Sequence, residues 1–404
     1  MIYKKIIRII FAIVYGLPIF ILIISIRKFL LIRFQSVMSE RIGHFTTNID
    51  LYLCEKKFNI NRPKIKNYID IFCLQKKISN NFLAKKWSEK ITIIHYILVI
   101  PIIDCLKFFK QFHYHEIKNN TNSDRDVHNL LDKTEPFIEF TDKEKKRGFD
   151  ALSEFGICQN TKFVSIIIRD SSYFAKQFKN NYDYRKIKNY NIETFYPAIK
   201  FLIKEGYKVI IMGSDQSQKI NFKDDSIFDY SNSKIRSDFL DIFIISRCKF
   251  FIRTSGLGGV AVLFRKPVLH LNAHLGLFTT STKKNLLLPK NFYSKKDKRK
   301  LYLSEIFDKG FAFDYDEYTL KKENILLEES SGDILNATKE IYEIVENKRE
   351  YSETEKKLQK SFKKFYLDKV KSCGLSKLHG EFFAEVSIDF LKKRSKEFQM
   401  IDKN

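Results

Sequence analysis

Apolar runs of strand length alternate with segments of helical periodicity through the second half of the chain. The runs that predict buried strands are residues 163–168, 207–212, 250–252 and 268–271. The segments that predict helices are residues 141–155, 193–205, 238–247 and 257–264. Because parallel strands need a long crossover between them, usually a helix, this alternation predicts a parallel α/β sheet.

The first half carries a similar pattern at lower density. Its predicted strands are residues 31–34, 69–74 and 91–94, and its predicted helices are residues 45–56, 79–90 and 96–112. The polar stretch 113–135 is the best candidate for a linker, and His113 and His115 are expected to be solvated there rather than to bind a metal. Two α/β halves with ligand-binding turns at their strand ends predict a crevice between the halves.

These patterns divide the chain into four parts. The predicted divisions are a membrane anchor at residues 1–33, an N-terminal Rossmann-like domain at 34–135, a C-terminal Rossmann-like domain at 136–347 and C-terminal helices at 348–404. Within the third part, the lysine-rich stretch 283–300 is expected to be an exposed basic loop. Thr141 and Glu144 have the spacing of a capping box at the start of the first helix after the linker.

The N-terminus contains 18 consecutive residues without a charge, at positions 9–26. A membrane span needs roughly 20 apolar residues, so this run is just long enough. Basic residues flank the run on both sides, with Lys4, Lys5 and Arg8 before it and Arg27, Lys28 and Arg33 after it. Three arrangements remain open, namely a helix that crosses the bilayer, a kinked helix within one leaflet, and a buried core helix.

The formal net charge of +24 indicates either an anionic partner or another reason for the excess of basic residues. Anionic membrane lipids and an anionic small substrate fit the composition, and lysine-rich coding in an AT-rich genome is a further source. Nucleic acid ranks last because the chain has no helix-turn-helix, RNA-binding signature or zinc finger. The six cysteines form no Cys-x-x-Cys pair, so neither a disulfide framework nor a zinc site is expected.

Three predicted strands of the second half end in residues suited to anions. Arg169 and Asp170 follow one strand, Gly213 and Ser214 follow the next, and the third ends in Thr254-Ser255-Gly256 before a glycine-rich helix. The arginine can donate two hydrogen bonds to a phosphate, and the glycine lets a ligand approach the backbone closely. The amides at the start of the helix also attract an anion, so all three features favour a bound phosphate. An ordinary βα turn whose glycines only relieve packing is an equal alternative, and Arg169 is also placed to pair with a neighbouring aspartate.

Several short stretches occur together in an order that is specific as a set. They are Arg41-Ile42-Gly43-His44, Ile168-Arg169-Asp170-Ser171-Ser172-Tyr173, Asp183-Tyr184-Arg185, residues 206–213, Asp229-Tyr230-Ser231, Ser237-Asp238-Phe239-Leu240-Asp241 and residues 254–272. With them, the chain resembles a bacterial family of glycosyltransferases of surface-polysaccharide and lipopolysaccharide loci. The resemblance covers most of the chain.

The resemblance implies a GT-B architecture, in which two Rossmann-like domains face a cleft. The C-terminal domain would bind a nucleotide-sugar donor, and the N-terminal domain would bind a lipid-linked or surface-glycan acceptor. Arg169 is similar to the arginine that GDP-fucose transferases place on the β-phosphate, although Ile167 stands where those enzymes carry histidine. The donor-binding residues implied are Arg169, Gly213, Ser214, Asp229, Tyr230, Thr254, Ser255 and Gly256.

The same resemblance directs the choice of catalytic groups. His44 is the expected general base and Asp170 the second catalytic candidate, with Asp183 as a further alternative. A role for His44 in starting its helix is equally open. Neither a metal nor another cofactor is expected, since a GT-B enzyme stabilises its leaving group with cationic side chains and helix amides. Asp314-Tyr315-Asp316 matches a metal-binding D-x-D, but its late position favours a solvated loop.

Two other functions use the same layout. One is transfer of another anionic group, such as pyruvyl, onto a surface polysaccharide. The other is a membrane-associated scaffold that keeps the fold without the activity. For the transferase, the apolar N-terminus and the resemblance together imply a location at the cytoplasmic face of the inner membrane, although basic residues on both sides of the run leave its orientation open.

Overall fold

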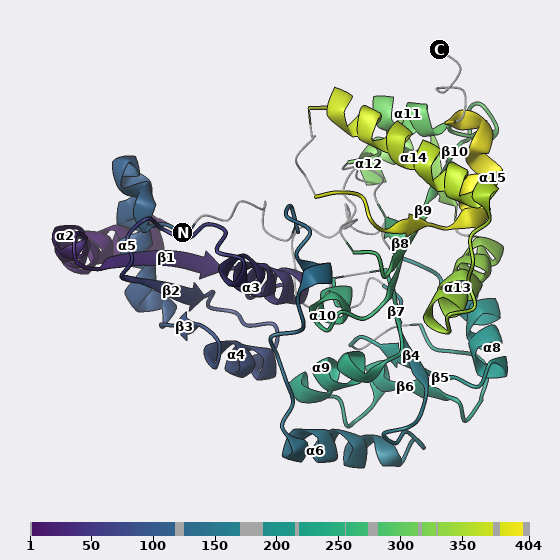
Figure 1. Ribbon diagram of the computed structural model, residues 1–404, viewed down its shortest axis with the longest axis horizontal. Helices are drawn as coiled ribbons and strands as arrows, with labels where there is room; N and C mark the ends of the chain where they lie inside the picture. The colour runs from purple at the N-terminus through teal and green to yellow at the C-terminus, as the bar shows by residue number, and fades with distance from the viewer. Residues whose placement is uncertain are drawn as a thin grey trace. The chain divides into compact units, whose positions relative to one another are not determined.

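The computed structural model describes residues 2–117, 125–169, 189–214, 218–254, 256–273, 282–313, 317–328, 330–374 and 380–398. The chain forms two compact units. Unit 1 comprises Met1–Asp124 and Pro136–Glu139, and unit 2 comprises Arg125–Glu135 and Phe140–Asn404. The chain therefore changes units within and just after the polar stretch predicted as a linker. Figure 1 shows the elements of both units.

Unit 1 is a small parallel α/β unit. Its sheet has the order β1-β2-β3, formed by Leu31–Val37, Tyr68–Leu74 and Thr92–Ile93. Its helices are α3 (Ile42–Lys57), α4 (Asn81–Ser88), α5 (Tyr96–Phe108) and the 3₁₀ segment η2 (Lys110–His115). Each predicted strand and helix of the first half is therefore present, with boundaries shifted by a few residues.

A buried ion pair joins the first two strands of unit 1. Arg33 lies in β1 directly beside Asp70 of β2, and its guanidinium donates to both Asp70 oxygens at 2.7 Å. The Tyr52 hydroxyl donates to Asp70 at 2.6 Å, and burial together with this carboxylate raises the pKa of Tyr52. Arg33 is 7% exposed, so its predicted place among the basic residues flanking the membrane run is wrong.

The predicted linker stretch is partly wrong for the same reason. His115 has no exposed surface, because η2 packs beside β1 and its imidazole Nδ1 is 2.6 Å from the Ile32 carbonyl oxygen. Burial lowers the pKa of His115. The backbone of Ile117 continues this contact by donating to Phe34 in β1. Residues 110–117 are therefore part of unit 1, in which His113 is exposed as expected and His115 is not.

The apolar N-terminus forms a continuous helix made of α1 (Ile2–Phe11), the π-helical turn η1 (Ala12–Gly16) and α2 (Leu17–Ile26). Of the part of the chain that the structure describes, only the helix Ile6–Ile26 is long and apolar enough to span a membrane. This helix packs on α5 at Gly16, where an added Cβ would lie 2.8 Å from the Pro101 backbone oxygen. It is therefore attached to unit 1 along one side.

Unit 2 is built on a seven-stranded parallel sheet with the order β13-β9-β8-β7-β4-β5-β6. Its strands, in chain order, are β4 (Phe163–Ile167), β5 (Lys208–Met212), β6 (Ile227–Asp229), β7 (Phe251–Arg253), β8 (Val268–Ala273), β9 (Asn285–Pro289) and β13 (Glu385–Val386). A second sheet, β11-β10-β12, is antiparallel and uses Arg299–Lys300, Asn291–Ser294 and Ile325–Glu328. The parallel α/β prediction is confirmed in this unit.

The helices of unit 2 enclose this sheet. They are α6 (Asp142–Ser153), α8 (Tyr196–Lys204), α9 (Asp238–Arg247), α10 (Gly258–Leu263), α11 (Leu303–Asp308), α12 (Glu317–Lys322), α13 (Ser331–Val345), α14 (Glu353–Ser372) and α15 (Ile388–Arg394). Short 3₁₀ turns are η3 (Leu131–Lys133), η5 (Ile192–Phe195), η6 (Tyr230–Asn232) and η7 (Ser395–Glu397). The predicted capping box is confirmed, since Thr141 and Glu144 bond each other's backbone at the start of α6.

Two segments differ from their predicted form. The stretch 283–300 is mostly strand, because its apolar part Asn285–Pro289 is buried in the main sheet and the lysines occupy the following hairpin. Residues 348–404 are not a separate helical part. Phe362 of α14 and Val386 of β13 belong to the same buried cluster as Ile166 of the central strand β4. The C-terminal segment is thus held by the hydrophobic core of unit 2.

Candidate functional site

The strand order of unit 2 reverses at β4. From β4 the sheet grows in one direction through β5 and β6, and then β7 pairs on the opposite side of β4. In parallel sheets, ligands bind outside the carboxyl ends of the strands at such a point, because the connecting helices leave toward opposite faces and open a crevice. The carboxyl ends of β4 and β7 therefore define the candidate site of this unit.

The Thr254 side chain joins these two strand ends. Its hydroxyl donates to the Ile167 carbonyl at 2.9 Å and accepts the backbone N–H of Arg169 at 2.8 Å. The Thr254 backbone N–H also donates to Ile167 at 3.3 Å. Thr254 is 7% exposed, so its role is to fix the backbone that leaves β4 and to hold Arg169 at the switch point.

Two arginines lie at this position. Arg169 follows β4 and is half-buried, and Arg253 is the last residue of β7, in register with Ile167. Gly258 leaves room for the second one, since a Cβ at that glycine would lie 2.3 Å from Cδ of Arg253. Gly258 therefore makes room for a neighbouring side chain, as expected for an ordinary βα turn. The side chain that occupies this space is the cationic Arg253.

Sequence reasoning missed Arg253 and its neighbour His270. His270 is in register with Arg253 on β8 and is 6% exposed. Burial and the Arg253 charge hold the pKa of His270 well below its ordinary value, so the imidazole is neutral at pH 7. The signal in the sequence was a histidine inside the apolar run 268–271, which marks a polar group placed in a buried strand.

The β5 end offers a backbone that only glycine adopts easily. Gly213 follows β5 with φ of +135°, a conformation that a side chain would strain. Ser214 beside it is half-buried. The predicted close approach of a ligand to this backbone stays a prediction, but the conformation that would permit it is present.

Two of the implied donor-binding residues, Asp229 and Tyr230, make hydrogen bonds within their own segment. The Asp229 carboxylate accepts from Ser231 Oγ at 2.6 Å and from the Asn232 amide at 2.9 Å, which closes the turn after β6. Tyr230 has no exposed surface, and its hydroxyl donates to Asp241 at 2.8 Å. Its side chain therefore supports the turn and presents no surface to a ligand.

Asp241 is a further residue that the sequence analysis did not select as a candidate for catalysis or binding. It lies in the first turn of α9, which is capped by Ser237. Burial raises the pKa of Asp241 to about 6, above the ordinary value of 3.8, against the opposing hydrogen bond from Tyr230. Carboxylates perturbed in this way are enriched at functional sites, although buried structural groups show the same shift.

The glycine-rich turn is less favourable for an anion than predicted. Helix α10 has only six residues, so its dipole is small and its amides are few. Gly256 is exposed and its carbonyl accepts the N–H of Gly259. Ser255 lies outside the described residues, as do Asp170, Asp183 and Asp314-Tyr315-Asp316. Among the described residues, no group of three or more histidine, cysteine or acidic side chains is arranged to hold a metal.

His44 belongs to unit 1. It is the third residue of α3, half-buried, in the first helical turn after β1. The turn that precedes it is fixed by Ser39, whose hydroxyl donates to Lys77 at 2.9 Å and accepts the Gln75 N–H at 2.9 Å. The histidine thus occupies the strand-to-helix turn that the sequence predicted, and its catalytic role stays a prediction.

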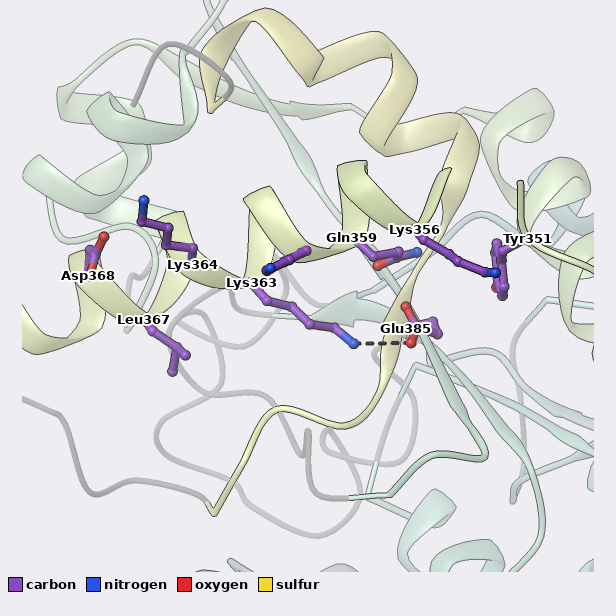
Figure 2. A pocket seen from close by; sticks show the side chains of 9 residues that line it. Tyr351, Lys356, Gln359, Lys363, Lys364, Leu367, Asp368 and Glu385 are labelled. Atoms are coloured by element: carbon purple, nitrogen blue, oxygen red, sulfur yellow. Dashed lines mark hydrogen bonds and ion pairs between the residues drawn. The ribbon is translucent and has the colours of Figure 1, made fainter. Parts of the chain in front are cut away.

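A surface groove of about 550 Å³ lies along α14 in unit 2. Figure 2 shows Lys356, Lys363 and Lys364 of this helix along it, with Lys363 paired to Glu385 at 3.1 Å. None of the predicted site residues lines the groove. Exposed lysines and one ion pair do not by themselves form a specific anion-binding site. The carboxyl ends of β4 and β7 therefore remain the candidate functional site.

No protein-family model and no curated protein matches the chain. Among solved structures, it is similar to a glycosyl transferase of family 9 from Veillonella parvula DSM 2008, with 12% identity, a TM-score of 0.41, and coverage of 76% of this chain and 96% of that chain. It is also similar to TibC, a dodecameric iron-containing heptosyltransferase in complex with ADP-D-β-D-heptose, with 10% identity, a TM-score of 0.35, and coverage of 78% of this chain and 77% of that chain.

The hydroxyl of Thr254 should be essential to this site. We expect Thr254→Val, which keeps the shape, to lower the free energy of unfolding by about 1–3 kcal/mol, because the Arg169 N–H loses the hydroxyl that accepts it and the Ile167 carbonyl loses one of its two hydrogen bonds from Thr254. Thr254→Ser keeps the hydroxyl and should lose less than half as much. Urea unfolding of the three proteins tests this, and equal effects of Val and Ser would contradict it.

Asp241 should make stability depend on pH. Because the folded protein binds this proton more tightly than the unfolded chain, its contribution to stability is largest below about pH 4 and is lost as the pH rises through about 6. Asp241→Asn should therefore be more stable than the unmodified protein at pH 7, by on the order of 2–3 kcal/mol, with the difference vanishing near pH 4. Thermal unfolding across this range, with exposed Asp225→Asn as the control, would reject the assignment if both variants behave alike.

Proposed function

We propose that the protein is a glycosyltransferase that moves a sugar from a nucleotide-sugar donor to a surface-glycan or lipid-linked acceptor. The observation that carries the proposal is the switch point of unit 2, where Thr254 fixes the two strand ends that bear Arg169 and Arg253. Two guanidinium groups at the carboxyl edge of a parallel sheet suit a diphosphate, since each fork donates to two oxygens. The motifs shared with glycosyltransferases of surface-polysaccharide loci support the same reading.

Arg169 is the residue proposed to stabilise the leaving group. In transfer, the bond between the anomeric carbon and the diphosphate oxygen breaks, and negative charge develops on the departing nucleoside diphosphate. A cation held in place before the reaction lowers this barrier because no reorganisation is needed when the charge appears. The hydrogen bond that the Arg169 backbone N–H donates to Thr254 supports this role, because it fixes the backbone that carries the side chain.

The acceptor hydroxyl must lose a proton as its oxygen bonds to the anomeric carbon. His44 is the proposed base and would take that proton on its imidazole, since a histidine side chain can accept a proton through a ring nitrogen. His44 is placed for this role in the first turn of α3, just after the carboxyl end of β1. Asp170 remains the second proposed catalytic group from the sequence.

The proposal predicts metal-independent donor binding that depends on Arg169. A nucleoside diphosphate at about a hundred times its Kd should add about 2.7 kcal/mol to the free energy of unfolding of the detergent-solubilised protein, with EDTA present. Arg169→Ala should weaken binding about 10- to 100-fold through loss of charge-assisted hydrogen bonds. A thermal-shift screen of nucleoside diphosphates and nucleotide-sugars measures both effects.

Arg299→Ala is the matched control, because Arg299 lies in the hairpin of unit 2 and pairs with Glu305. Its ligand-induced shift should equal that of the unmodified protein. A shift with phosphoenolpyruvate and none with nucleotides would replace the proposal by pyruvyl transfer. A shift that requires Mn²⁺ would contradict the metal-independent form, and no shift with any of these ligands would favour the scaffold.

His44 should affect turnover and not donor binding. We expect His44→Ala to lower kcat for sugar transfer about 10²- to 10⁴-fold, the usual contribution of a general base. The Kd for the nucleoside diphosphate should stay unchanged, since the donor residues lie in unit 2. Transfer assays and calorimetry separate the two quantities, and an equal loss of stability and activity would instead assign His44 a role in starting α3.

A further inference from the structure

Exposed apolar side chains are concentrated on one part of unit 1. Among the described residues, 19 large hydrophobic side chains are exposed, and 12 of them lie on the N-terminal helix or on α5. We call these 12 the apolar platform, and they are Ile6, Ile7, Ile9, Ile10, Phe11, Ile13, Val14, Ile21, Leu22, Ile97, Leu98 and Phe108. Soluble proteins rarely expose a contiguous apolar surface of this kind without a partner.

The exposed side chains of α1 cover more of its circumference than a stripe does. At 100° per residue, the exposed platform residues of α1 cover an arc of about 200°. A helix that docks on protein buries a stripe of roughly 100°, so a protein groove would leave half of this arc in water. Only 17% of the most apolar stretch is buried within the protein. Hydrocarbon, which contacts a helix from several sides, fits this arc.

The helix is nevertheless attached to α5 along much of its length. Arg8 donates to both oxygens of Asp104 at 2.6 Å, Gly16 touches Pro101, and the Phe20 ring lies 5.5 Å from that of Phe112 just after α5. Helix α5 has 13 residues and is about 20 Å long, which is too short to cross a bilayer. A helix held by these contacts cannot cross the bilayer without breaking them.

Exposed cations border the apolar platform. Arg27 and Lys28 follow the N-terminal helix, Lys107 lies in the last turn of α5, and Lys110 begins η2 just after it. The Arg27 guanidinium stacks on the Tyr114 ring at 3.8 Å, which fixes it at this border. Each such cation strengthens binding to an anionic lipid surface about fivefold at low salt.

We infer that the apolar platform inserts into one leaflet of an anionic bilayer, with the N-terminal helix and α5 lying together in the interface. The cations at its border then meet the lipid headgroups, and both ends of the N-terminal helix stay on one side of the membrane. This inference goes beyond the proposed glycosyl transfer and does not rest on it. It also distinguishes the arrangement from a single spanning helix, in which α5 would have no contact with lipid.

Vesicle binding of the full-length protein tests the role of α5. On vesicles of phosphatidylcholine with phosphatidylglycerol, Phe108→Ser should lower the partition coefficient about tenfold, because the exposed ring loses its transfer into hydrocarbon. The control Tyr318→Ser removes an equally exposed ring from α12 and should have no effect. Lys28→Gln with Lys107→Gln should lower binding about 25-fold at low salt, and by much less on phosphatidylcholine alone.

Depth of insertion tests the one-leaflet arrangement. Tryptophan at Val14 or Phe108, measured against the buried native Trp87, should be quenched at both positions, and more strongly by lipids brominated near the headgroup than near the chain ends. If Val14→Trp is quenched best near the chain ends and Phe108→Trp not at all, the helix spans alone and the inference is overturned. Absence of quenching at both positions would overturn it in favour of a protein partner.

Discussion

The candidate site depends on the two hydrogen bonds of the Thr254 hydroxyl. It joins the ends of β4 and β7, the two strands that pair where the strand order reverses. It also fixes the backbone that carries Arg169. A buried hydroxyl performs the same task in unit 1, where Ser39 ties the turn after β1 to the end of β2. In both units, the residues proposed for chemistry follow a strand whose exit is fixed by one short polar side chain.

Unit 1 has only three strands and obtains its rigidity differently. The Arg33–Asp70 pair is buried between β1 and β2, and both carboxylate oxygens are occupied by the arginine fork while Tyr52 adds a further bond. Such a pair is costly to desolvate, and it stabilises a structure only when its hydrogen bonds are complete. Because a register shift would separate the two charges inside the protein, the pair specifies the alignment of β1 with β2.

Local signals in the sequence predicted most elements of the fold. Apolar runs marked the strands, and the Thr141 capping box marked the start of α6 correctly. The errors have a common physical origin. Arg33 and His115 are polar residues that the fold buries through distant partners, Asp70 and the Ile32 carbonyl, and no local pattern reports such partners.

The sequence by itself determined the alternation of strands and helices, the apolar N-terminus and which polar residues follow three of the strands, because each follows from residues close together in the chain. Only the tertiary structure decided that β7 pairs with β4 and β8 with β7, which places Arg253 in register with Ile167 and His270 in register with Arg253. Strand order is set by packing between segments about a hundred residues apart in the chain. The N-terminal helix is attached to α5 by packing over a similar separation. Sequence spacing therefore predicted the parts of the site, and pairing across the sheet brought them together.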